Sequence, residues 1–284
     1  TLGNDLGAAA LHARLGRLVC HWCCHEKRRP EQCPTCQHAG MHELGVGTER
    51  LEQAVKERFP EAITARMDAD TMAERGAHER VLAAFRKRHI DVLIGTQMIA
   101  KGLDFPDVTL VGVVSADTGL FVPDYRAAER TFQLLHQVAG RAGRGEKAGT
   151  VVIQTFCPDN YAVQAAARND FESFVQQELS FRKVTGYPPF ARLVRVLAES
   201  RTEAEARELL RAAVQPLQAM ADVEVLGPSP AVIAKVKDHW RWHMLVKAFT
   251  PASFAMAMAA IGTVEDLATR SCRVTLDVDP SSLM

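Results

Sequence analysis

The sequence QVAGRAGR, from Gln137 to Arg144, is the stretch on which the interpretation of the whole chain depends. It closes an apolar-periodic segment that predicts a helix, and its two arginines each follow a glycine. A glycine such as Gly140 lets the backbone come close to a ligand. Arg141 and Arg144 offer planar, permanently charged donors for phosphate oxygens. The pattern therefore favours a phosphate site, and the structural alternative is a glycine-rich helix end with surface arginines.

The region before this stretch alternates between helix and strand patterns. The periodicity predicts helices at 49–59 and 74–88 and strands at 62–67, 91–95, 108–114 and 151–154. Such alternation predicts a parallel sheet covered by helices, with its ligand site beyond the carboxyl ends of the strands. Thr96 follows one strand directly and can donate to a nucleic-acid phosphate, while Gly102 and Asp104 can face a nucleotide.

Four of the seven cysteines form two CxxC pairs near the start of the chain. The pairs are Cys20 with Cys23 and Cys33 with Cys36. Each pair can turn two thiolates toward one tetrahedral ion, and disulfides are disfavoured in a reducing cytoplasm. The spacing predicts zinc binding. Redox-silent buried cysteines are the alternative, but the charged residues around these pairs are too polar for a core.

The last part of the chain predicts a separate α+β domain. Residues 160–183 predict one long helix or two helices, and later elements are expected at 191–198, 203–220, 223–226, 231–237, 241–249, 252–268 and 274–278. The segments 231–237 and 241–249 predict a hairpin. Its side chains Lys235, Lys237 and Arg241 can take phosphates, and Trp242 can stack on a base. A solvated basic hairpin with one tryptophan in the core is the alternative.

Composition limits the class of protein. The 284 residues are 47% hydrophobic and 24% charged, as in soluble globular proteins. No apolar run reaches the roughly 18 to 20 residues that a bilayer span requires, and no signal peptide is recognisable. We therefore expect a cytoplasmic protein without a membrane partner. Positive and negative side chains balance at 34 each, so any nucleic-acid binding must come from local patches.

Several motifs in fixed order identify a family resemblance. GTQMIAKGLDFPDVTLVGV, ADTGLF, PDYRAAER and QVAGRAGR follow one another in the sequence, with GTE at 47–49, RMDADT at 66–71 and LDVDP at 276–280. This set resembles the primosomal protein N′ family, the replication-restart DNA helicases of superfamily 2. The resemblance implies an α/β fold: a RecA-like C-terminal helicase lobe at 43–158 with an embedded zinc-binding module at 1–42, then linking helices and a small α+β C-terminal domain at 159–284.

The resemblance also implies site residues. Motif V would be Thr96, Gln97, Gly102 and Asp104, and motif VI would be Gln137, Gly140, Arg141 and Arg144. Asp104 departs from the histidine common in the family, although helicases at large carry aspartate there. In motif VI the arginines would act on the γ-phosphate of ATP. We expect catalytic roles for Arg141, Arg144 and Gln137, nucleotide contacts at Gly102, Asp104 and Gly140, and DNA contacts at Thr96 and Gln97.

The cofactors implied by the resemblance depend on residues beyond this chain. The family holds two zinc ions with eight cysteines, so the four here would share up to two Zn²⁺ with cysteines upstream, although one shared ion or empty sites are alternatives. The sequence has no GxxxxGK[ST] loop, so ATP and Mg²⁺ would be bound mainly by a lobe not present here. We therefore expect the chain to be inactive alone. Thr1 in place of Met favours a start within a longer polypeptide.

The function implied for the full-length protein is ATP-dependent 3′-to-5′ unwinding of DNA. Such a protein would recognise stalled or branched replication forks and direct primosome assembly. Its partners would be forked and single-stranded DNA, the single-stranded DNA-binding protein, primosome proteins and the replicative helicase loader. The alternative is a non-catalytic DNA-binding and primosome-assembly protein derived from the same lobe. An unrelated zinc-ribbon protein would not explain the motor spacing of the glycine and arginine motifs.

Overall fold

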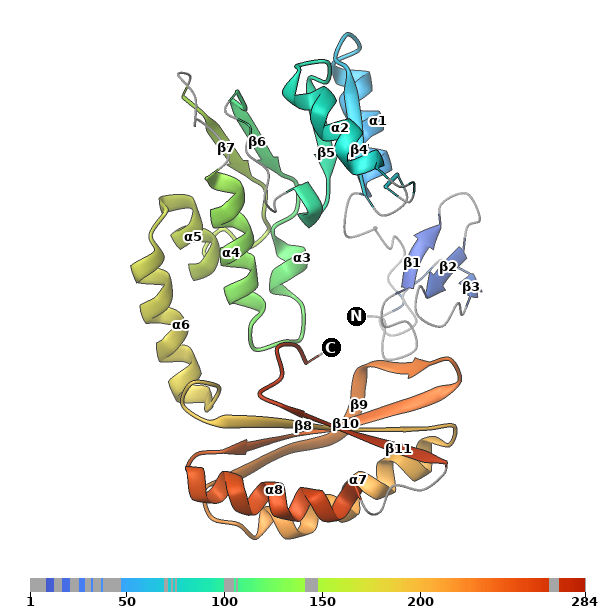
Figure 1. Cartoon of the computed structure of the whole chain (residues 1–284), viewed down its shortest axis with the longest axis vertical. Helices are drawn as coiled ribbons and strands as arrows, with labels where there is room; N and C mark the ends of the chain where they lie inside the picture. Colours follow the sequence, from blue (N-terminus) through green and yellow to red (C-terminus); the bar gives the residue numbers. More distant parts are fainter. Residues whose placement is uncertain are drawn as a thin grey trace. The chain divides into compact units, whose positions relative to one another are not determined.

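The chain divides into two compact units in a computed structural model (Figure 1). Unit 1 comprises Thr1–His42, Pro123–Tyr125 and Leu179–Met284, and unit 2 comprises Glu43–Val122 and Arg126–Glu178. The structure describes residues 9–12, 17–20, 26–28, 32, 37, 47–68, 71–72, 74, 76–99, 105, 107–140, 148–265 and 271–283. Within those ranges, no helix has the length and apolar character needed to cross a bilayer.

Unit 2 alternates helices with short parallel strands. Strand β4 (Thr64–Met67) pairs in parallel with β5 (Val92–Gly95), and β6 (Leu110–Val113) pairs in parallel with β7 (Thr150–Ile153). The helices are α1 (Thr48–Arg58), α2 (Ala77–Arg86), η2 (Gln97–Ile99), α3 (Asp117–Leu120), α4 (Ala127–Ala139), α5 (Tyr161–Arg168) and the first part of α6 (Phe171–Thr185). The predicted alternation is confirmed. The described strands, however, form two separate two-stranded sheets where the pattern predicted one.

Helix α4 packs into the larger of the two hydrophobic clusters of unit 2. Its apolar residues Phe132 and Leu135 recur at helical spacing and are only 2% and 1% exposed. The Phe132 ring stacks on Phe174 of α6 at 4.1 Å between centroids. A second, smaller cluster joins Met67 of β4 to Leu82 of α2. Ile99 and Phe105, which follow β5 in the sequence, pack against this smaller cluster.

Residues 160–183 form two helices, one of the two arrangements that the sequence allowed. The side chain of Asn160 accepts a hydrogen bond from the backbone N–H of Ala162 at 2.9 Å and so caps α5. Asn169, in the left-handed conformation, ends α5, and the Asp170 carboxylate accepts from the N–H of Ser173 at the start of α6. Polar side chains therefore set both helix boundaries.

Unit 1 is built on a four-stranded antiparallel sheet in the order β11-β8-β10-β9, with helices α7 and α8 on one face (Figure 1). Its elements are β8 (Arg192–Ser200), α7 (Glu203–Gln218), β9 (Val223–Val236), β10 (His239–Ala248), α8 (Pro251–Glu265) and β11 (Cys272–Val278). Three short antiparallel strands, β1 (Ala9–His12), β2 (Arg17–Cys20) and β3 (Glu26–Arg28), also belong to unit 1. The predicted small α+β domain is confirmed.

The prediction for β9 was wrong in one respect. The sequence predicted an extended segment ending at Gly227-Pro228 and a separate strand from Ala231, whereas β9 continues through this stretch. The pairing of β9 with β10 shifts register at two places, which lets the strand continue past Gly227-Pro228. Gly227 has φ +104, and an added Cβ there would lie 3.0 Å from the carbonyl oxygen of His243. Glycine thus lets the strand bend without breaking its ladder.

Candidate functional site

The carboxyl ends of β4 and β5 form the first part of the candidate site. Met67 pairs with Gly95 in the parallel register, so Asp68 and Thr96 follow them at the same edge. A Cβ on Gly95 would lie 2.5 Å from the carbonyl oxygen of Met67, which explains why glycine ends β5. Thr96 and Gln97 are both exposed, and Gln97 starts η2. Their polar groups are therefore accessible to a ligand.

A hydrogen-bond network around Asp68 orders this edge. The Thr48 hydroxyl, at the start of α1, donates to Asp68 Oδ2 at 2.5 Å, and Arg66 Nε forms an ion pair with the same oxygen at 2.9 Å. The backbone N–H of Thr71 donates to Asp68 Oδ1 at 2.9 Å. These contacts connect the start of α1, the end of β4 and the turn that follows it. We call them the Asp68 network.

Asp68 accepts every bond of this network and is only 7% exposed. Burial alone would raise the pKa of its carboxyl. The hydrogen bonds from Thr48 and Thr71, with the charge of Arg66, outweigh burial and hold the pKa below its usual value. The stretches GTE and RMDADT were predicted only to match the family. A hydroxyl at a helix start and an aspartate after a strand were the signals that could have revealed the network.

The second part of the candidate site lies at the end of α4. Gln137 is half-buried in the last turn, and Gly140 is exposed and donates its N–H to the carbonyl of His136 at 3.0 Å. Among the described residues, no hydrogen bond links Gln137 with Thr96 or Gln97. The two parts are held by different elements of unit 2.

The β9–β10 hairpin places the four predicted DNA contacts differently. Lys235 is exposed near the end of β9 and Lys237 is exposed in the two-residue turn, and Lys235 Nζ lies 5.1 Å from the centre of the Trp240 ring. Arg241 Nε instead forms an ion pair with Glu199 at 3.1 Å, with the arginine side chain 14% exposed. Trp242 packs against the main core of unit 1. The lysines therefore face solvent, while Arg241 and Trp242 have partners inside the domain.

Several predicted site residues lie outside the described residues. They are Gly102, Asp104, Arg141, Arg144, Cys23, Cys33 and Cys36. Cys20 ends β2. Within the described ranges, no group of three or more potential metal-ligating side chains is gathered. The zinc ligands and the paired arginines stay predictions.

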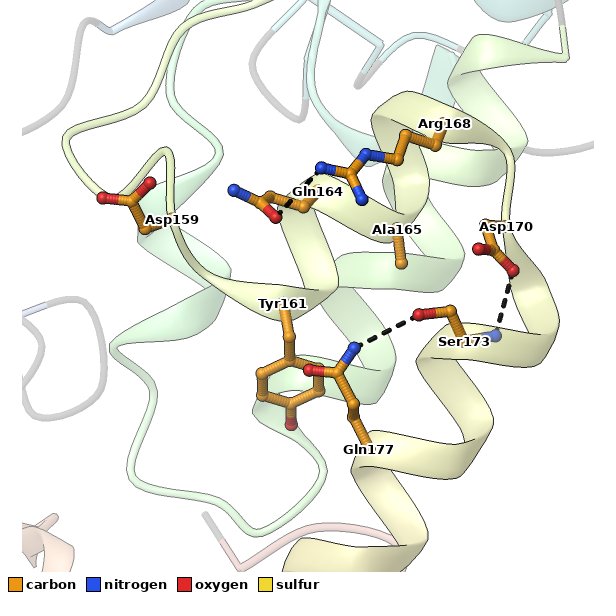
Figure 2. Close-up of a pocket in the computed structure, with 8 residues that line it drawn as sticks. All are labelled: Asp159, Tyr161, Gln164, Ala165, Arg168, Asp170, Ser173 and Gln177. Atoms are coloured by element: carbon orange, nitrogen blue, oxygen red, sulfur yellow. Dashed lines mark hydrogen bonds between the residues drawn. The ribbon is translucent and has the colours of Figure 1, made fainter.

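Two pockets are lined by residues other than the predicted site residues. The first, of about 80 Å³, is lined by residues of α5 and α6 and the segments before them, and there Gln177 Nε2 donates to Ser173 Oγ at 3.2 Å. Figure 2 shows its lining residues. A pocket of about 440 Å³ in unit 1 is lined by Tyr187, Lys247 and neighbours. The Lys247 ammonium there donates to the Thr185 carbonyl and to the Glu224 carboxylate. Its charge is therefore paired within unit 1.

Comparison with known protein families defines the class first. The helicase conserved C-terminal domain matches residues 41–146, which include both parts of the candidate site. The primosomal protein N C-terminal domain matches residues 183–281, which form most of unit 1. The chain is thus a helicase-type lobe followed by a primosomal C-terminal domain.

The relatives identify the family. Over 94% of its length the chain is 42% identical to the replication restart protein PriA of Bacillus subtilis and 38% identical to that of Synechocystis. It is also 42% identical to the PriA of Treponema pallidum over 96% of its length. The chain belongs to the PriA family and corresponds to its C-terminal portion. It spans 34%, 32% and 42% of the length of these three relatives.

Proposed function

We propose that this chain is the second motor lobe and C-terminal domain of an ATP-dependent DNA helicase that unwinds DNA 3′ to 5′ at stalled or branched replication forks. The observation that carries the proposal is a pair of exposed polar residues, Thr96 and Gln97, at the carboxyl edge of β4 and β5. The Asp68 network lies at the same edge. In open α/β sheets this edge is where ligands bind. The printed names of the relatives, replication restart proteins, agree with this class of activity.

In this proposal α4 delivers the catalytic groups. Gln137 and Gly140 close the helix, and Arg141 and Arg144 follow directly in the sequence. The arginines stabilise charge on the γ-phosphate of an ATP that, with Mg²⁺, another part of the full-length protein holds through a phosphate-binding loop. Gly102, Asp104 and Gly140 face that nucleotide. Arginine fingers contribute about 10³ to 10⁵ in rate in phosphoryl transfer generally.

DNA would be held at two places. Thr96 and Gln97 contact the strand that the motor moves along, and Lys235 and Lys237 contact phosphates at the hairpin. The two lysines are exposed, as such contacts require. Cys20, Cys23, Cys33 and Cys36 bind up to two Zn²⁺ together with further cysteines of the full-length protein. In the cytoplasm the protein works with the single-stranded DNA-binding protein, primosome proteins and the replicative helicase loader.

The decisive experiment removes one guanidinium from the full-length protein. Arg144→Ala is expected to reduce DNA-stimulated ATP hydrolysis by at least about 10³-fold while leaving the circular dichroism spectrum and melting temperature unchanged. Arg211→Ala is the matched control, because Arg211 is exposed on α7 and pairs with Glu208 of the same helix. Near-normal hydrolysis by Arg144→Ala would contradict the motor assignment. Absence of hydrolysis in the wild type would favour the alternative, a non-catalytic DNA-binding and primosome-assembly protein.

A further inference from the structure

Two phenylalanines of unit 2 are exposed on segments that follow its second pair of parallel strands. The last residues of β6 and β7 pair with each other, so the segments 115–122 and 154–157 both leave the carboxyl edge of this pair. Phe121, in the first segment, is 70% exposed, and Phe156, in the second, is 79% exposed. They are the two most exposed phenylalanines among those that the structure describes. The candidate site at β4 and β5 uses neither ring.

One buried aspartate holds the backbone at both phenylalanines. The N–H of Phe121 donates to the carbonyl of Asp117 at 3.1 Å, and the N–H of Phe156 donates to both oxygens of the Asp117 carboxylate, each at 3.1 Å. The Thr155 hydroxyl donates to Asp117 Oδ1 at 2.7 Å and accepts from the N–H of Cys157 at 3.0 Å. Asp117 is only 5% exposed. The two exposed rings are therefore carried by ordered backbone.

The packing of α3 leaves Phe121 on the outside. Ala116 and Leu120 pack in the larger hydrophobic cluster of unit 2. Gly119 fits closely against α4, since an added Cβ there would lie 2.6 Å from Oγ1 of the buried Thr131. These contacts fix α3, so its packing does not require the ring of Phe121.

The exposed surface of the two segments suits a single-stranded nucleic acid. Their charge comes from Asp117 alone, whose side chain is buried, so no exposed carboxylate of these segments would repel a phosphate. Their exposed residues are two aromatic and three neutral polar ones: Phe121, Phe156, Ser115, Thr118 and Gln154. Aromatic rings stack on bases, and hydroxyl and amide groups donate to phosphate oxygens. Because these segments expose no aliphatic side chain, bases fit them better than the apolar face of a protein partner does.

From these observations we propose that Phe121 and Phe156 form a stacking site for the bases of single-stranded DNA. The inference rests on the proposed function, which brings a DNA strand to the carboxyl edges of the lobe's strands. It adds a contact that is independent of sequence to the polar contacts at Thr96 and Gln97, because every base has an aromatic face. Asp117 orders both backbones before DNA binds, so little conformational entropy is lost when the bases stack.

The first test measures the binding of oligo(dT) by the full-length protein. Phe121→Ala and Phe156→Ala are each expected to raise Kd by about 5-fold or more, the factor that the loss of one stacked base contact costs. Phe59→Ala is the matched control, because Phe59 is 58% exposed but lies after α1, before the amino end of β4, and should leave Kd unchanged. An unchanged Kd in either stacking variant, or an equal rise in the control, would overturn the inference.

Further variants separate stacking from general apolar contact. Phe156→Trp keeps a flat ring and should bind oligo(dT) at least as tightly as the wild type, whereas Phe156→Leu should bind as weakly as Phe156→Ala. Equal Kd values for Phe156→Trp and Phe156→Leu would contradict stacking. The slope of log Kd against log salt should be the same in all these proteins, because no charge is changed. A changed slope would trace the loss to phosphate contacts and overturn the inference.

Tryptophan fluorescence gives a readout that does not depend on ATP hydrolysis. In Phe156→Trp the added indole should emit as a solvent-exposed indole before DNA is added, and oligo(dT) should quench it. Emission typical of a buried indole without DNA would mean that another part of the protein covers the site, which overturns the inference. A wild type that hydrolyses ATP and binds oligo(dT), with alanine variants that bind equally well, would remove the stacking site and retain the proposed function. A wild type that does not bind oligo(dT) would remove both.

Discussion

The C-terminal domain of unit 1 and the helicase lobe of unit 2 differ in strand length and in the size of their hydrophobic clusters. Strand β8 alone has nine residues and pairs on both sides, whereas each described strand of unit 2 has four. One large cluster joins both helices of the C-terminal domain to its sheet, while the lobe has two smaller clusters. Long ladders and one large cluster stabilise the C-terminal domain, whereas two-stranded sheets and smaller clusters stabilise the described part of the lobe.

The two regions also differ in how exposed the polar residues of their sheets are. In the lobe, Thr96 and Gln97 are exposed after a strand. In the C-terminal domain, Lys247 and Arg195 lie on the sheet and are 4% and 7% exposed, with partners for their charges. Charges buried with partners support structure, whereas exposed polar groups on an ordered edge are available for binding. The comparison therefore favours the strand ends of the lobe over the sheet of the C-terminal domain as a place for a ligand.

The largest expected effect comes from truncating the two cores separately. Phe132→Ala should lower the free energy of unfolding of unit 2 by about 3–5 kcal/mol, and Leu210→Ala that of unit 1 by about 2–5 kcal/mol. Phe132 and Leu210 are 2% and 0% exposed. Differential scanning calorimetry should show two transitions, of which each variant lowers one. If both variants lowered both transitions equally, the division into two cores would fail.

A somewhat smaller effect should depend on pH and belong to unit 1. Burial, with the nearby charges of Arg195 and Arg241, lowers the pKa of His243 from 6.5 to about 4. The unfolded histidine binds a proton near pH 6.5 and the folded one only near pH 4, so acid favours the unfolded chain. The loss should grow from pH 6.5 to pH 4 and reach about 3 kcal/mol.

The check compares wild type with His243→Phe by denaturant unfolding at pH 7.5 and pH 4.5. The variant should lose less stability between these two pH values than the wild type. Parallel losses in both proteins would mean that other groups cause the acid sensitivity of unit 1.

The smallest expected effect on stability concerns the Asp68 network of the lobe. Asp68→Asn removes the charge that Thr48 and Arg66 contact and should destabilise unit 2 by about 1–3 kcal/mol at pH 7. Because the pKa of Asp68 is lowered, this contribution persists above the usual aspartate pKa and is lost as pH falls through the folded value. Urea unfolding measures it. Asp107→Asn is the control, since Asp107 pairs with Arg88 on the surface and should cost less than about 1 kcal/mol. Equal costs would mean that the Asp68 network is no more than surface pairing.

Periodicity predicted most elements because many helices and strands place apolar residues on one face, as α4 does with Phe132 and Leu135. The same reasoning placed Thr96 directly after a strand, where it lies. It could not predict that β9 continues through Gly227-Pro228, because the neighbouring strand β10 decides this. Nor could it predict the pairing of Asp124 with Leu283, since residues 159 positions apart meet only through the fold. The roles of Arg141 and Arg144 stay predictions, because both lie outside the described residues.

Strand β8 is buried on both faces from Leu193 to Ala198, with Arg195 as the only charge in that run. Apolar segments of six or seven residues with high strand propensity are those that self-associate when a protein opens. Partial denaturation at high concentration should therefore lead to aggregates seeded by this segment, which Arg195 opposes from within and Arg192 and Glu199 oppose from its two ends. Replacing Arg195 with an apolar residue would make the protein harder to refold, whatever it did to the native state.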